Sequence, residues 1–109
     1  MKLISLIHEI CVGEQFEDIT APDFYACMNL HPCQCVLKIK PREKIRVCYL
    51  ISLMREQLPG QDKDKWKEAI LKHLDIDEDY YKSKYREPVS DLPSIPNQKF
   101  AKEMDGIFR

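Results

Sequence analysis

Cysteine and histidine side chains gather in one short stretch of the sequence, where their chemistry would suit a metal ion. Cys27, His31, Cys33 and Cys35 lie close together, and thiolates and imidazoles are the usual ligands of tetrahedral zinc. Their spacing differs from that of zinc fingers, in which pairs of ligands flank a loop. Cys33 and Cys35 also lie on the apolar face of a segment with alternating polarity, so burial accounts for them without metal. We therefore predict no metal and no other cofactor, and keep these four residues only as a weak zinc candidate.

A second group of chemically active side chains is a basic stripe of five cations at alternate positions. Residues 36–58 carry six basic and two acidic residues, a net charge of +4, whereas residues 1–35 carry one basic and five acidic residues, a net charge of −4. An anion such as nucleic acid would account for cations at the start of a helix, where the helix dipole disfavours them. We favour a solvated face that pairs with the acidic first third of the chain. The basic stripe consists of Lys38, Lys40, Arg42, Lys44 and Arg46.

Residues 64–86 resemble a helix-turn-helix, the motif in which a sharp turn joins a support helix to a DNA-reading helix. Residues 74–77 would form the turn, and Tyr81 would take a buried position on the second helix. Asp75 stands where glycine is usual, and acidic residues 77–79 open the second helix, where they would repel phosphates. We therefore favour a helical corner that packs the core, with nucleic-acid recognition as the alternative.

Patterns typical of enzymes are missing from the sequence. The three glycines are too widely spread to form a phosphate-binding loop, and no serine stands in a nucleophile elbow. The three histidines, at positions 8, 31 and 73, are scattered along the chain. We therefore predict that the protein is not an enzyme.

The end of the chain offers a different kind of function. A proline-rich stretch at 87–97 predicts an extended spacer, and residues 98–109 place Phe100, Met104 and Phe108 on one side of a short amphipathic helix. We expect this helix to fold back onto the core. The alternative is that these three side chains bind a groove on a protein partner or on a second copy of the chain.

Composition limits the class of protein to which the chain belongs. Its 109 residues suit one domain, 44% of them are hydrophobic, and 32% are charged. No apolar run approaches the roughly 20 residues that cross a bilayer. The N-terminus briefly resembles a signal peptide, but His8 and Glu9 interrupt its apolar run. These features, together with an odd number of cysteines, predict a soluble, cytoplasmic protein without membrane contact.

The periodicity of apolar residues predicts the elements that must position these side chains. Helices are expected near residues 2–12, 22–30, 42–58, 62–74, 78–86 and 98–109, and a short strand near 33–40. The segment 42–58 has the longest apolar stripe and should be central; a hairpin around residues 41–43 is the alternative there. The stripe consists of Val47, Leu50, Ile51, Met54 and Leu58.

Together these patterns predict a mainly α-helical protein, a small bundle of five or six short helices with at most one short strand or hairpin near residues 33–40. Residues 1–86 would form the compact domain, followed by the spacer at 87–97 and the helix at 98–109. The function we predict is a non-enzymatic interaction or regulatory module that binds a protein partner or itself. The alternative is a nucleic-acid-binding regulator that uses residues 64–86 and the basic stripe to bind DNA.

Overall fold

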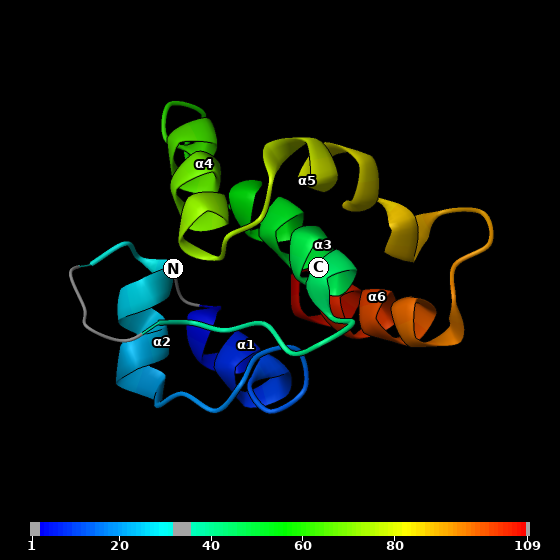
Figure 1. Cartoon of the computed structure of the whole chain (residues 1–109), viewed down its shortest axis with the longest axis horizontal. Helices are drawn as coiled ribbons and strands as arrows, with labels where there is room; N and C mark the ends of the chain where they lie inside the picture. Colours follow the sequence, from blue (N-terminus) through cyan, green and yellow to red (C-terminus); the bar gives the residue numbers. More distant parts are fainter. Residues whose placement is uncertain (1–2, 32–35, 109) are drawn as a thin grey trace.

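Helices make up most of the chain, as the apolar periodicity predicts. The computed structural model describes residues 3–31 and 36–108, and within these residues it contains six α-helices, one 3₁₀ turn and no strand (Figure 1). The prediction of a small, mainly α-helical bundle is therefore confirmed. The elements are α1 (Ile4–Cys11), α2 (Ala21–Met28), α3 (Lys44–Arg55), α4 (Lys63–His73), α5 (Glu78–Lys84), the 3₁₀ turn η1 (Glu87–Val89) and α6 (Ile95–Phe108).

Helix α3 is the centre of the fold, because α4, α5, η1 and α6 all pack against it (Figure 1). The side chains of Val47, Leu50, Ile51 and Met54 are fully buried. Each such burial contributes on the order of 1.5–3 kcal/mol, so this predicted stripe anchors the molecule. The helix is shorter than the predicted 42–58. It begins later because Arg42 adopts a left-handed backbone conformation with φ of 69°, and it ends at Arg55.

The first two helices form a separate pair beside this centre (Figure 1). Helix α2 starts as its sequence predicts: the Thr20 hydroxyl accepts a hydrogen bond from the Asp23 amide at 3.3 Å, and Pro22 lies in the first turn. The Trp66 indole of α4 donates to the Met28 carbonyl at 2.8 Å. This buried bond joins α4 to the end of α2.

The strand expected near residues 33–40 does not form in the part that the structure describes. Residues 33–35 lie outside the described residues, and residues 36–40 contain only an isolated antiparallel bridge between Ile39 and Phe16. Two backbone hydrogen bonds flank that bridge, Glu17 N to Lys38 O at 2.9 Å and Lys40 N to Gln15 O at 2.9 Å. The segment therefore runs beside residues 15–17 without entering a sheet.

The end of the chain differs from the prediction in two ways. The stretch 87–97 is not a uniformly extended spacer, because η1 buries Pro88 and α6 already begins at Ile95. The Ser94 hydroxyl accepts a hydrogen bond from the Asn97 amide at 3.3 Å, so this serine caps the helix. Proline is tolerated in a first helical turn, which allows Pro96 to lie there.

Candidate interaction surfaces

The weak zinc candidate is described only in part. Cys27 is buried and His31 is exposed, whereas Cys33 and Cys35 lie outside the described residues. Within residues 3–31 and 36–108, no three His, Cys, Asp or Glu side chains are grouped as metal ligands.

None of the helices in this part of the chain is long and apolar enough to span a membrane.

Two of the five cations of the basic stripe make hydrogen bonds within the fold. Arg46 lies within the fold, where it pairs with Glu43 and donates to the Asn97 side-chain oxygen at 2.8 Å. Lys40 Nζ donates to the Gly13 carbonyl at 2.6 Å. These two side chains connect segments of the protein, so their charges have a structural role.

Four of the five cations lie near the turn of the helix-turn-helix-like segment. Lys38, Arg42 and Lys44 line a hollow of about 550 Å³ together with Lys40, and Leu74 and Asp75 also contribute to it. The structure thus brings the two predicted nucleic-acid elements to one place. The Lys44 ammonium also lies 4.7 Å from the centre of the Tyr80 ring.

The turn between α4 and α5 contains one left-handed residue. Asp75 takes φ of 57°, the left-handed conformation for which glycine is usual. The Ile76 amide donates to the Leu71 carbonyl at 2.9 Å, which closes the end of α4. Helix α5 then begins with acidic residues, and only Glu78 among them has an ion pair, with Lys67 at 3.0 Å, in the described part of the chain.

The structure contradicts the alternative prediction for the end of the chain, in which Phe100, Met104 and Phe108 bind a partner. Phe100 is 4% exposed and Met104 is 0% exposed, because α6 turns both toward α3 and η1. Phe108 packs against the same core and is only partly buried. The helix therefore folds back onto the domain, and Phe100 and Met104 offer no surface to a partner.

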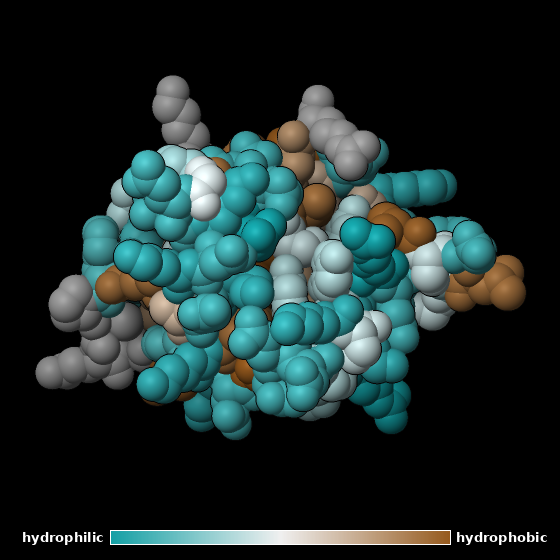
Figure 2. Space-filling model, turned by 90° about the horizontal axis from the view of Figure 1, so that it is seen from above, coloured by the Kyte–Doolittle hydropathy of each residue, from teal (hydrophilic) through white to brown (hydrophobic). Residues whose placement is uncertain are grey.

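Large apolar side chains are instead exposed where η1 is joined to α6, in a segment we call the apolar loop: residues 89–95, from the last residue of η1 to the first residue of α6. Leu92 is 95% exposed and Ile95 is 80% exposed, and Val89 at the start of the loop is also exposed. Figure 2 shows hydrophobic atoms projecting at the end of the molecule where Figure 1 draws this loop. A group of exposed aliphatic side chains of this size is a candidate contact surface.

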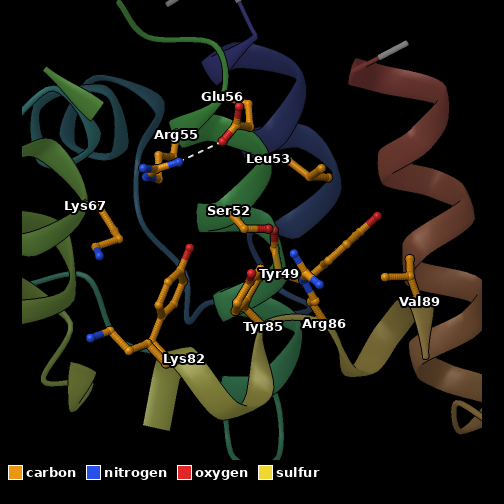
Figure 3. A pocket seen from close by; sticks show the side chains of 11 residues that line it. Tyr49, Ser52, Leu53, Arg55, Glu56, Lys67, Lys82, Tyr85, Arg86 and Val89 are labelled. Carbon is orange, nitrogen blue, oxygen red and sulfur yellow. Dashed lines mark hydrogen bonds and ion pairs between the residues drawn. The ribbon is translucent and has the colours of Figure 1, made fainter. Parts of the chain in front are cut away.

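A groove opens between α3, α4, α5 and η1, next to the apolar loop. Its volume is about 640 Å³, and Val89 belongs to both the groove and the loop (Figure 3). The lining combines cations, tyrosine rings, a serine and two aliphatic side chains with a single carboxylate. The groove residues are Tyr49, Ser52, Leu53, Arg55, Glu56, Lys67, Tyr81, Lys82, Tyr85, Arg86 and Val89.

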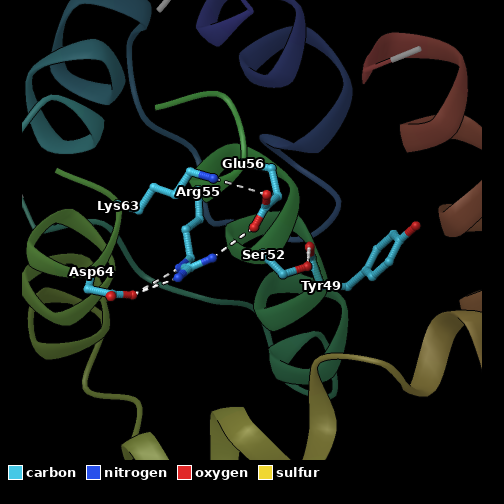
Figure 4. Close-up of polar contacts among 6 residues, drawn as sticks. All are labelled: Tyr49, Ser52, Arg55, Glu56, Lys63 and Asp64. Carbon is cyan, nitrogen blue, oxygen red and sulfur yellow. Dashed lines mark hydrogen bonds and ion pairs between the residues drawn. The ribbon is translucent and has the colours of Figure 1, made fainter. Parts of the chain in front are cut away.

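Two of the four groove cations are already paired. The Arg55 guanidinium donates to Asp64 at 2.7 and 3.2 Å and to Glu56 at 2.7 Å, which ties the end of α3 to the start of α4 (Figure 4). Lys67 pairs with Glu78, as described above. Lys82 and Arg86 are exposed and have no ion pair with any carboxylate in the described residues.

Tyrosine rings form one wall of the groove. The rings of Tyr81 and Tyr85 are stacked, with centroids 5.1 Å apart and planes 12° from parallel. The Arg86 guanidinium carbon lies 5.4 Å from the Tyr85 centroid, and Lys67 lies 5.5 Å from that of Tyr81. Burial raises the pKa of Tyr81 to about 12, although nearby Arg55 acts against the shift. Tyr81 therefore remains a neutral hydroxyl near neutral pH.

Neither the groove nor the apolar loop was predicted from the sequence. The groove residues come from four elements, and no local spacing relates Arg55 to Lys82 or Arg86. A partial signal does exist at 81–86, where two tyrosines four residues apart alternate with cations. For the apolar loop, the signal is that Val89, Leu92 and Ile95 recur at intervals of three within a proline-rich stretch. An extended spacer does not need aliphatic side chains at these positions.

Comparison with family models, with curated proteins and with solved structures finds no significant match to this chain.

Proposed function

We propose that this protein is a non-enzymatic interaction module that binds another protein through the apolar loop. The supporting observation is the exposure of Leu92 and Ile95, 95% and 80%, on a molecule whose other large apolar side chains are mostly buried. Burying such side chains is the main driving force of protein association.

The position of the loop favours insertion into a partner. Pro88 at its start is buried, and α6 at its end packs on α3 and η1, so both ends are fixed to the domain. A loop held in this way loses little conformational entropy on binding. The loop alone is too small for the roughly 800 Å² that each partner buries in a stable interface. We therefore expect the partner to extend over a neighbouring surface as well.

The test compares proteins retained by tagged forms of the full chain from the cells that express it. The loop variant Leu92→Ser with Ile95→Ser removes apolar surface without touching the core, and Leu6→Ser, at another exposed apolar position, is the matched control. We expect at least one protein to bind the wild type and the control but not the loop variant. Equal recovery of the same proteins by all three forms would contradict the proposal.

The second candidate function is nucleic-acid binding, which one observation favours: Lys38, Arg42 and Lys44 share a hollow with the turn that joins α4 to α5. Anisotropy with labelled duplex DNA would test it. DNA binding should fall steeply as salt is raised. The double variant Lys38→Glu with Arg42→Glu should abolish it. The control variant Lys99→Glu with Lys102→Glu, whose residues are exposed on α6, should bind DNA as the wild type does. Absence of binding at about 50 mM salt would remove this candidate.

A further inference from the structure

The groove carries positive charge that the protein itself leaves unmatched. Arg55 and Lys67 are paired with carboxylates, but Lys82 and Arg86 have no such partner in the described residues. In Figure 3, Lys67 and Lys82 lie at the α4 side of the groove, and Arg86 lies nearer to Val89. A ligand that spans the groove would therefore meet a cation near each end.

The remaining lining is suited to apolar side chains. Leu53 and Val89 present aliphatic surface, and Tyr49 and Tyr85 present aromatic rings. The contact between Arg86 and the Tyr85 ring restrains the guanidinium, which reduces the entropy lost when the arginine binds a carboxylate. Tyrosine and arginine are also the residues enriched where protein interfaces gain most of their binding energy.

We propose that the groove binds an acidic segment of a partner protein, with carboxylates on Lys82 and Arg86 and an apolar side chain against Leu53 and Val89. This inference rests on the proposed function, because Val89 connects the groove to the apolar loop. The segment follows the groove as an extended or helical peptide. The Arg86 guanidinium donates two parallel hydrogen bonds to one carboxylate, and Lys82 pairs with a second carboxylate.

The surroundings of the groove favour a peptide over nucleic acid. Glu56 lies in the groove, and Asp64 and Glu78 lie beside it, each in an ion pair with a groove cation. A duplex would bring many phosphates against these carboxylates, which would repel them. A peptide places its few charges only at the unpaired cations.

The probe for the test is a short fluorescein-labelled peptide in which glutamate pairs alternate with leucine. The control probe replaces each glutamate by glutamine and keeps the leucines. Fluorescence anisotropy with the full wild-type chain should show binding of the acidic peptide and at least about tenfold weaker binding of the glutamine peptide. The affinity for the acidic peptide should also fall as salt is raised.

Charge-reversal variants assign the binding to the groove. The variant Lys82→Glu with Arg86→Glu should weaken the affinity for the acidic peptide about tenfold. The control variant Lys99→Glu with Lys102→Glu changes the net charge equally and should leave this affinity unchanged. Both pairs are exposed, so circular dichroism should show the wild-type helix content.

Several results would overturn the inference. These are failure of the acidic peptide to bind, equal binding of the glutamine peptide, and equal weakening by both charge-reversal variants. If duplex DNA binds the same residues more tightly than the peptide does, the groove belongs to nucleic acid. If sedimentation shows a dimer, and Lys82→Glu with Arg86→Glu dissociates it, the groove belongs to a second copy of the chain. If the acidic peptide does not bind, but the variant Leu92→Ser with Ile95→Ser still fails to retain a protein that the wild type retains, only the inference about the groove is wrong.

Discussion

At the scale of single residues, two buried thiols, those of Cys11 and Cys48, behave as small hydrophobic groups. Cys11 and Cys48 have no exposed surface. Burial is the main cause that raises the pKa of Cys11 to about 12 and that of Cys48 to about 11. The thiolate is the reactive form of cysteine, so neither side chain is suited to nucleophilic or redox chemistry in the folded protein.

These raised pKa values predict that stability falls in alkaline solution. Above the ordinary thiol pKa of 9.0, the unfolded chain releases protons that the folded chain retains. The free energy of unfolding should therefore decrease from about pH 9 to pH 11, by up to about 1.4 kcal/mol per pH unit for each thiol. Urea unfolding across this range would measure the slope.

The double variant Cys11→Ala with Cys48→Ala provides the control. It should be less stable than the wild type at neutral pH, because two buried sulfur atoms are removed. Its stability should nevertheless depend less on pH between about pH 9 and pH 11. Identical slopes for the two proteins would show that these thiols do not titrate differently in the folded and unfolded chains.

At the scale of elements, the sequence predicts the helices well and their ends less well. The apolar stripe of α3 repeats at helical spacing, which places its side chains on one face of a helix. The ends depend on single backbone conformations, such as that of Arg42, and on caps. Asn97 resembles a cap in the sequence, yet it lies inside α6, where it accepts a hydrogen bond from Arg46 of α3. A partner fifty-one positions away leaves no local signal.

The candidate site was less predictable than the fold for the same reason. Helical periodicity reports which face of a helix is buried, but it does not report which exposed faces become neighbours. Lys82 and Arg86 lie on and just after α5, whereas Leu53 lies on α3 and Lys67 on α4. Only the packing of α4 and α5 against α3 brings them to one groove.

The turn between α4 and α5 allows a direct test at this scale. The left-handed backbone of Asp75 is sterically unfavourable because of its Cβ atom, which glycine lacks. Asp75→Gly should therefore raise the free energy of unfolding by up to about 1 kcal/mol. Thermal or urea unfolding of the purified variant would measure this change.

The same substitution at a helical position is the matched control. Asp79 lies in α5 and is exposed. Asp79→Gly should lower the free energy of unfolding by about 0.5–1 kcal/mol, since glycine loses more backbone entropy in a helix. Destabilisation by Asp75→Gly of similar size would mean that the side chain of Asp75 contributes more to the turn than its backbone strain costs.

At the scale of the whole molecule, the last helix completes the core. Phe100, Ala101 and Met104 are buried, and α6 packs against both α3 and η1. The buried side chain of Asn97 adds a polar contact with Arg46 at the same interface. Because α3 is central to the fold, uncovering one of its faces affects the packing of every element around it.

Removal of residues 95–109 should therefore unfold the domain and not merely release a tail. Loss of the Phe100 and Met104 side chains alone corresponds to core truncations that each cost about 2–5 kcal/mol, against a typical total stability of 5–15 kcal/mol. We expect the shortened chain to lose its cooperative thermal transition in circular dichroism. The loop variant Leu92→Ser with Ile95→Ser should keep that transition, because exposed substitutions usually change stability by less than about 0.5 kcal/mol. A shortened chain that melts at the wild-type temperature would instead mean that α1 to η1 fold independently, and that α6 is free to leave α3 for a partner.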